Sequence, residues 1–175
     1  ALQVLVLDDN LFEQIPPCLC NMPALRELYL NRNLIEAIPE EISDLTALSR
    51  LVLDSNNLSD LPETLSDLKS LEVLAMPNNN ITALPRGLGN LARLTILDLQ
   101  CNSLAALPAS IGGCTALEVL EVRINNMKDL PSELGKCSRL KVLSASNNNL
   151  YRIPQACGRL KELRVLKLGA NNLFE

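Results

Sequence analysis

The chain of 175 residues is dominated by an asparagine that recurs every 23 residues without an insertion. The eight positions are Asn10, Asn33, Asn56, Asn79, Asn102, Asn125, Asn148 and Asn171. An apolar residue lies three places before each asparagine, and a leucine lies five places before it. The chain therefore divides into seven complete repeats and one partial repeat, which begin at residues 2, 25, 48, 71, 94, 117, 140 and 163. A strict period of this length indicates a stack of equivalent units around one continuous core.

Each repeat predicts one short strand and a returning segment. In Leu28-Tyr29-Leu30 the two leucines face one side of an extended segment while Tyr29 faces the other. Such short strands are stable only beside one another, and identical strands pair in parallel only if every connection returns to the same end. The rest of the repeat is long enough for that return. The result is a right-handed coil with one repeat per turn.

A proline lies at the start of the predicted return in all seven complete repeats. These residues are Pro16, Pro39, Pro62, Pro85, Pro108, Pro131 and Pro154. Proline fixes φ and lacks an N–H group, which is typical of the start of a helical turn. Helical turns are wider than the strand spacing of about 4.8 Å, so the stack must bend with its strands on the inside.

The repeated asparagine is predicted to be structural. Its amide offers two donors and an acceptor, which can satisfy turn backbone groups that would otherwise be buried without partners. We assign none of the eight asparagines a binding role.

Each unit reads L-x-x-L-x-L-x-x-N-x-[LIFM]-x-x-[LI]-P, with Met76, Val122 and Ala145 in place of the third leucine. In this motif the chain resembles the leucine-rich repeat family, in the 23-residue class with Leu-Pro or Ile-Pro at its centre. The resemblance implies a right-handed α/β leucine-rich-repeat solenoid, a horseshoe with a parallel sheet on the concave face and short helical or 3-10 turns on the convex face. Arrays of this class occur in intracellular scaffolds of Ras signalling and cell polarity and in Roco-type kinases and GTPases.

The 175 residues are predicted to form a single array without its caps. The chain enters almost directly on a strand at Leu2 and stops just after one at Phe174, whereas stacked repeats need terminal caps with a polar outer face. We expect an excerpt from a longer array or a larger protein.

Composition excludes several classes of function. Without histidine the chain lacks the usual general base and the usual zinc ligand, so we expect no enzymatic activity and no cofactor. Without tryptophan, and with a net charge of -4, it is a poor match to nucleic acid. No apolar run approaches the roughly 20 residues of a membrane span.

The six cysteines are predicted to be free thiols. Cys114 and Cys137 occupy repeat positions that hold leucine elsewhere, which indicates core packing, with no disulfide or metal site. Free thiols favour a reducing compartment, so we expect an intracellular, cytoplasmic location.

Candidate binding residues lie on the outward side of the strands, where the repeat does not dictate identity. One group is Tyr29, Arg32, Arg50, Val52 and Asp54, and a second is Asp98, Glu121, Arg123 and Ile124. Tyrosine and arginine are enriched at interface hot spots, and the charges could set the register of a protein partner. The alternative is an ordinary solvated surface with weak ion pairs.

Two further patterns have alternative explanations. A column of β-branched residues runs from Val73 through Ile96, Val119 and Val142 to Val165, either as an apolar stripe for a partner or as β-propensity at a half-covered position, which we favour. Tyr151 and Phe174 share a position in neighbouring repeats, where they either stack on each other, which we favour, or form a second binding site.

The sequence predicts a protein-binding module, acting as a scaffold or adaptor in intracellular signalling. One alternative is the regulatory arm of a larger enzyme, such as a kinase, GTPase, phosphatase or ubiquitin ligase. Another is an architectural subunit, suggested by charge polarity. Residues 1–72 hold 13 acidic and four basic side chains, and residues 73–175 hold seven and 12.

Overall fold

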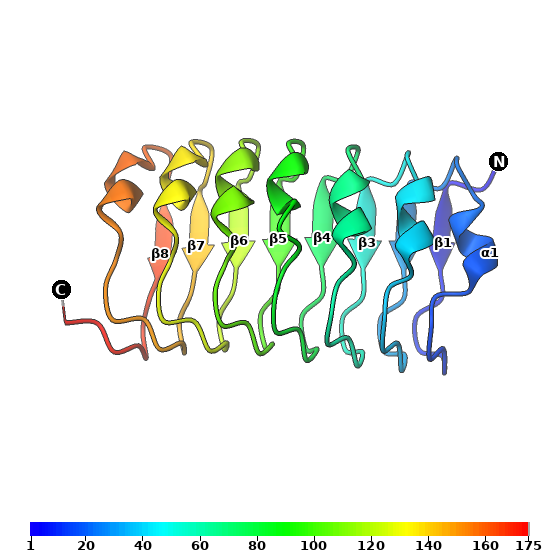
Figure 1. Cartoon of the computed structure of the whole chain (residues 1–175), viewed down its shortest axis with the longest axis horizontal. Helices are drawn as coiled ribbons and strands as arrows, with labels where there is room; N and C mark the ends of the chain where they lie inside the picture. The colour runs from blue at the N-terminus through cyan, green and yellow to red at the C-terminus, as the bar shows by residue number, and fades with distance from the viewer. Residues whose placement is uncertain (175) are drawn as a thin grey trace.

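A computed structural model describes residues 1–174, which contain one parallel sheet of eight strands. The strands are β1 (Val4–Val6), β2 (Glu27–Tyr29), β3 (Arg50–Val52), β4 (Val73–Ala75), β5 (Ile96–Asp98), β6 (Val119–Glu121), β7 (Val142–Ser144) and β8 (Val165–Lys167). They lie side by side in chain order, each paired with the strand of the preceding repeat (Figure 1). The predicted solenoid is therefore confirmed.

The register between strands equals the sequence repeat. Leu28 of β2 lies opposite Leu51 of β3, and the same pairing continues along the sheet. These central strand leucines are completely buried from β2 to β7, while the residues on either side face outward. Because every repeat inserts its leucines at the same depth, the buried side chains form one continuous core.

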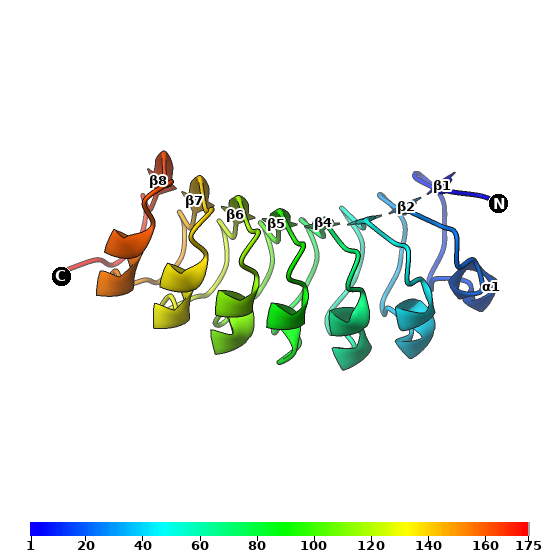
Figure 2. The same ribbon diagram turned by 90° about the horizontal axis from the view of Figure 1, so that it is seen from above.

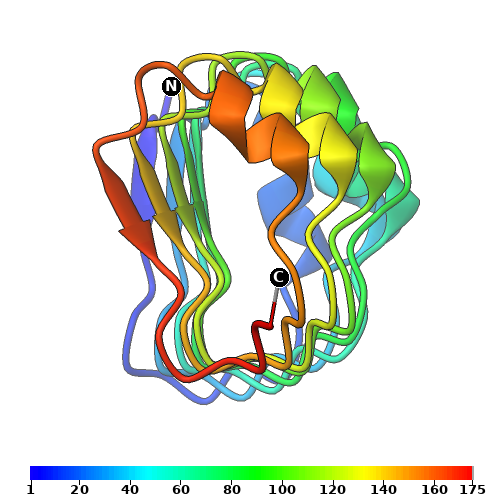
Figure 3. The same cartoon turned by 90° about the vertical axis from the view of Figure 1, so that its left-hand side faces the viewer.

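Short helices cover the other side of the core. They are α1 (Pro17–Cys20), η1 (Glu40–Asp44), η2 (Glu63–Asp67), η3 (Leu88–Asn90), η4 (Ala109–Gly113), η5 (Ser132–Lys136) and η6 (Gln155–Arg159). A proline directly precedes all of them except η3, which follows Gly87. Viewed along the stack, strands and helices occupy opposite sides (Figure 3). The strands follow the inner edge of the arc, so the sheet is the concave face (Figure 2).

The repeated asparagines link successive turns of the coil. The Nδ2 group of Asn56 donates to the carbonyl oxygens of Leu30 and Leu53 at 2.9 and 3.2 Å, and its Oδ1 accepts from the N–H of Ile35 at 3.0 Å. The same pattern recurs from Asn33 to Asn171, which confirms the structural interpretation at those positions. Asn10 differs, since it is exposed and donates only to carbonyls of its own turn.

Candidate functional site

The concave surface consists of four columns of side chains that run across the strands. The fourth column is the residue directly before each repeated asparagine, and there the backbone is left-handed, with φ between 52° and 57°. Its members are Asp9, Arg32, Ser55, Asn78, Cys101, Ile124, Asn147 and Ala170. This conformation favours glycine, asparagine or aspartate, yet no glycine occurs in the column. Sequence reasoning did not reveal this conformation.

In the first predicted group, Tyr29 and Arg50 meet at a carboxylate. The Tyr29 hydroxyl donates to Oε2 of Glu27 at 2.7 Å, and Nε of Arg50 lies 3.9 Å from the same oxygen. The hydrogen bond to Glu27 is the main cause that raises the pKa of Tyr29 above its ordinary value. Val52 lies opposite Tyr29 in register. Glu27 was not among the predicted site residues, although its spacing of 23 from Arg50 places the two side by side.

Arg32 and Asp54 do not join that contact. Arg32 forms a bidentate ion pair with Asp9 of the preceding repeat. Its Nε donates to Oδ1, and its Nη2 donates to Oδ2 at 2.7 Å. This pairing lowers the pKa of Asp9 and raises the pKa of Arg32. Asp54 accepts from Ser55 and from Asn78 at 3.0 and 2.8 Å. The predicted group is therefore three separate contacts.

A further series of side chains accepts hydrogen bonds from backbone N–H groups just after β2 and β3. Oδ1 of Asp8 accepts from the N–H of Asn31 at 2.7 Å, and Oδ1 of Asn31 accepts from the N–H of Asp54 at 2.8 Å. The next position is Pro77, which has no N–H to donate. This series of hydrogen bonds therefore ends just after β4, in the middle of the sheet.

The second predicted group brings two carboxylates together. Asp98 of β5 and Glu121 of β6 are opposite in register. Among the described residues, the Asp98 carboxylate accepts hydrogen bonds only from Gln100, through its backbone N–H at 3.1 Å and its side-chain amide at 3.2 Å. Burial is the main cause that raises the pKa of Asp98, and the nearby charge of Glu121 raises it further. Arg123 donates to Oε1 of Gln100.

A hollow of about 500 Å³, here called the concave hollow, lies over this group. Its lining includes Asp98, Gln100, Glu121, Arg123, Ser144 and Lys167. Ser144 and Lys167 continue the row of Asp98 and Glu121 onto β7 and β8. Neither Ser144 nor Lys167 was among the predicted site residues.

Ile124 lies outside the hollow and has two unfavourable features. Its side chain is 44% exposed, and its φ is 55°. A β-branched residue is strained in this conformation. Because the same conformation occurs at this position in all eight repeats, it belongs to the repeat, and the binding role of Ile124 stays a prediction.

The β-branched column is partly covered by its neighbours. Val73 is buried, Ile96, Val119 and Val142 are half-buried, and Val165 is exposed at 37%. This gradient fits β-propensity at a half-covered position better than a stripe open to a partner.

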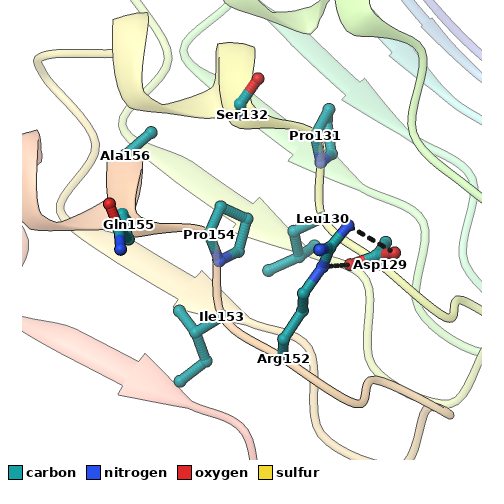
Figure 4. A pocket seen from close by; sticks show the side chains of 9 residues that line it. All are labelled: Asp129, Leu130, Pro131, Ser132, Arg152, Ile153, Pro154, Gln155 and Ala156. Carbon is teal, nitrogen blue, oxygen red and sulfur yellow. Dashed lines mark hydrogen bonds and ion pairs between the residues drawn. The ribbon is translucent and has the colours of Figure 1, made fainter. Parts of the chain in front are cut away.

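A second hollow lies on the flank, away from the sheet, beside the segments that lead into η5 and η6 (Figure 4). Nε of Arg152 lies 2.9 Å from Oδ1 of Asp129, and the Tyr151 hydroxyl donates to Oδ2 of the same carboxylate. Tyr151 stacks on Phe174 with ring centroids 6.2 Å apart, as predicted. These groups satisfy one another, so the flank hollow is the weaker candidate site.

The cysteines are free thiols, and Cys114 and Cys137 are completely buried in the core. Burial raises their pKa values to about 12 and about 11, which keeps both protonated and unreactive. Cys157 is only partly buried. Within residues 1–174, no group of three or more acidic, cysteine or histidine side chains is arranged to hold a metal ion. None of the helices described there is long and apolar enough to cross a bilayer.

A family model described as a leucine-rich repeat region matches residues 1–102 and, in an overlapping match, residues 70–173. No curated protein matches the chain.

Several solved structures are similar to the chain. A leucine-rich repeat protein of Leptospira interrogans has a TM-score of 0.94 and 32% identity, over 97% of this chain and 43% of its own. The plant peptide hormone receptor RGFR1, in complex with RGF2, has a TM-score of 0.91 and 36% identity, over 98% and 29%. The Arabidopsis receptor kinase HAESA, in complex with the peptide hormone IDA and the co-receptor SERK1, has a TM-score of 0.86 and 31% identity, over 97% and 30%. The chain thus spans less than half the length of each.

Proposed function

Because the chain belongs to the leucine-rich repeat family, we propose that it is a non-catalytic module that binds a protein partner on its concave sheet. The concave hollow is the main support, since it gathers charged and polar side chains that the repeat does not require. The similar plant receptors in complex with hormones support binding of a polypeptide. We further propose that the module acts as a scaffold or adaptor in intracellular signalling, which free thiols favour.

The binding mechanism is pre-organisation. Parallel strand pairing and the hydrogen bonds of the repeated asparagines fix the backbone that carries the concave side chains before a partner binds. A partner that contacts several strands at once therefore avoids much of the entropy cost of ordering a flexible surface. On this basis Tyr29, Arg32, Arg50, Val52 and Asp54 form one part of the interface, and Asp98, Glu121, Arg123 and Ile124 form the other.

The test combines partner identification with paired variants. Proteins retained by the immobilised chain would be identified by mass spectrometry, and a recombinant partner would be titrated by calorimetry. Tyr29→Ala with Arg50→Ala should weaken binding by about 2 kcal/mol or more, roughly 30-fold in affinity, with little change in thermal stability.

The flank offers a matched control. Tyr151→Ala with Arg152→Ala removes the same two residue types from the flank, where Arg152 lines the second hollow (Figure 4) and both side chains contact Asp129. Binding should survive this change. Equal loss of affinity in both double variants, or in neither, would remove the Tyr29 and Arg50 contact from the proposed interface.

A further inference from the structure

A buried serine in the concave hollow lacks a hydrogen-bond partner. Ser144 is 1% exposed, and its Oγ has no partner among the described residues. A buried hydroxyl without a partner destabilises the folded state and therefore needs an explanation. Ser66 and Ser110 share the property, but they belong to η2 and η4 on the opposite side of the molecule. Of these three serines, Ser144 is the one that lines the concave hollow.

The two neighbouring carboxylates form no ion pair among the described residues, although Arg123 is near enough to Asp98 for their charges to interact. Asp98, Glu121 and Ser144 are consecutive in register on β5, β6 and β7, so their backbones are about 4.8 Å apart from strand to strand. Asp98 is held by the neutral amide groups of Gln100. Glu121 forms no ion pair within residues 1–174.

The cations nearby are directed elsewhere or lie farther along the sheet. The guanidinium of Arg123 donates to Gln100. Lys167 lies opposite Ser144, two strands from Glu121, and forms no ion pair among the described residues. The row therefore has two adjacent negative charges at β5 and β6, a neutral hydroxyl acceptor at β7 and a positive charge only at β8.

A guanidinium fits this arrangement better than other polar groups. Its planar fork carries five N–H donors, which can reach two carboxylates and a hydroxyl oxygen together. An ammonium group has three donors and is more strongly hydrated, so its transfer into the hollow costs more. An incoming carboxylate would be repelled by Asp98 and Glu121.

We propose that the concave hollow is a subsite for an arginine side chain of the protein partner, with Asp98, Glu121 and Ser144 as its binding residues. This inference rests on the proposed function, since it assigns one contact of the same concave interface. The arginine places one positive charge beside the two carboxylates and donates to the serine oxygen.

The direct test is titration of the isotopically labelled chain with Nα-acetylarginine amide, followed by the backbone amide signals in two-dimensional NMR. Its citrulline analogue is the matched control, because it keeps the shape of the side chain but carries no charge. We expect saturable shifts at Asp98, Glu121 and Ser144 with the arginine compound and none with the citrulline compound. Equal shifts with both compounds, or no shifts with either, would overturn the proposal.

Variants then separate the roles of the binding residues. Glu121→Gln should weaken binding of the blocked arginine about tenfold, as expected for the loss of one charged partner. Ser144→Ala keeps both charges and should weaken it by a smaller factor. Glu27→Gln removes a carboxylate from the other half of the sheet and should leave binding unchanged. Retained affinity in Glu121→Gln, or equal loss in Glu27→Gln, would contradict the assigned site.

Failure of the arginine subsite can be distinguished from failure of the proposed function. If wild type does not bind the blocked arginine but a protein partner is lost on substitution of Tyr29 and Arg50, the subsite is wrong and the function stands. If the blocked arginine binds and no concave variant affects a protein partner, the proposed function is wrong, and the concave hollow binds a guanidinium group but not as part of a protein interface.

Discussion

The two halves of the concave sheet share one backbone but differ in how far their side chains satisfy one another. On β1 to β3, Arg32 pairs with Asp9, and Tyr29 and Arg50 share Glu27. On β5 to β8, among the described residues, the two carboxylates form no ion pair and the Ser144 hydroxyl has no hydrogen-bond partner. A partner must displace existing contacts in the first half, whereas it supplies missing ones in the second. We therefore expect the second half to contribute more affinity for each residue contacted.

The two halves meet at Pro77, where the series of hydrogen bonds from backbone N–H groups to side chains of the preceding repeat is interrupted. Asp8 and Asn31 each protect the backbone N–H of the next repeat, and Asp54 cannot do so because the following residue is Pro77. Beyond Pro77 the same column contains Gln100 and Arg123, which bond to each other. One residue without an N–H thus separates two surfaces on a continuous sheet.

The largest expected effect tests whether the repeated asparagines stabilise both halves of the array equally. Asn56→Ala and Asn125→Ala should each lower the free energy of unfolding by about 3 kcal/mol, because each leaves several buried backbone groups without partners. Urea denaturation would measure both. The exposed Asn10→Ala should have little effect. Very different losses at Asn56 and Asn125 would mean that the halves differ in framework as well as in surface.

A smaller effect concerns strain in the second half. Ile124→Asn should raise the free energy of unfolding by about 1 kcal/mol, since asparagine tolerates the left-handed backbone and little apolar burial is lost. Asn147→Ile, at the same position of the next repeat, should lower it by a similar amount. If Ile124→Asn is neutral or destabilising in thermal unfolding, the isoleucine is held by contacts that offset its strain.

The smallest effect is a dependence on pH at Asp98. The pKa of Asp98 is raised above its ordinary value of 3.8 mainly by burial, so the native state retains the proton to higher pH than the unfolded chain. The wild type therefore loses stability as pH rises through the window between these two pKa values. Asp98→Asn removes the buried charge and keeps an acceptor for the N–H of Gln100, so it should be more stable than wild type near neutral pH.

That difference should shrink as pH falls toward 3.8, the ordinary aspartate value, where the wild-type carboxyl becomes neutral as well. Thermal midpoints at several pH values would measure it. The exposed Asp60→Asn controls for the loss of one negative charge. A stability difference that is constant with pH would show that burial of the Asp98 charge is not its cause.

Much of the first half was predictable from spacing. Residues 23 apart lie side by side in this coil, so the pairs Asp9 with Arg32 and Glu27 with Arg50 can be found by aligning the repeats. The predicted group at Tyr29 omitted both acidic partners because it considered residue types and not the register. The stacking of Tyr151 on Phe174 was predicted by that same register and is confirmed.

The second half was less predictable. Asp98 and Glu121 were predicted as candidates from their charge, but serine at position 144 is unremarkable in a sequence. Its importance comes from the burial of its hydroxyl without a partner, which depends on the side chains around it. The left-handed backbone at Ile124 was also missed, since the column holds charged, polar and apolar residues without a common type.

The sequence by itself determined the coil, its register and its core, because one chemical pattern repeated every 23 residues leaves only one periodic way to bury its leucines and satisfy its turns. Tertiary structure alone decided which outward side chains pair and which stay unsatisfied. That outcome depends on distances of a few ångströms between side chains of neighbouring turns, and the repeat places no constraint on the identity of those side chains.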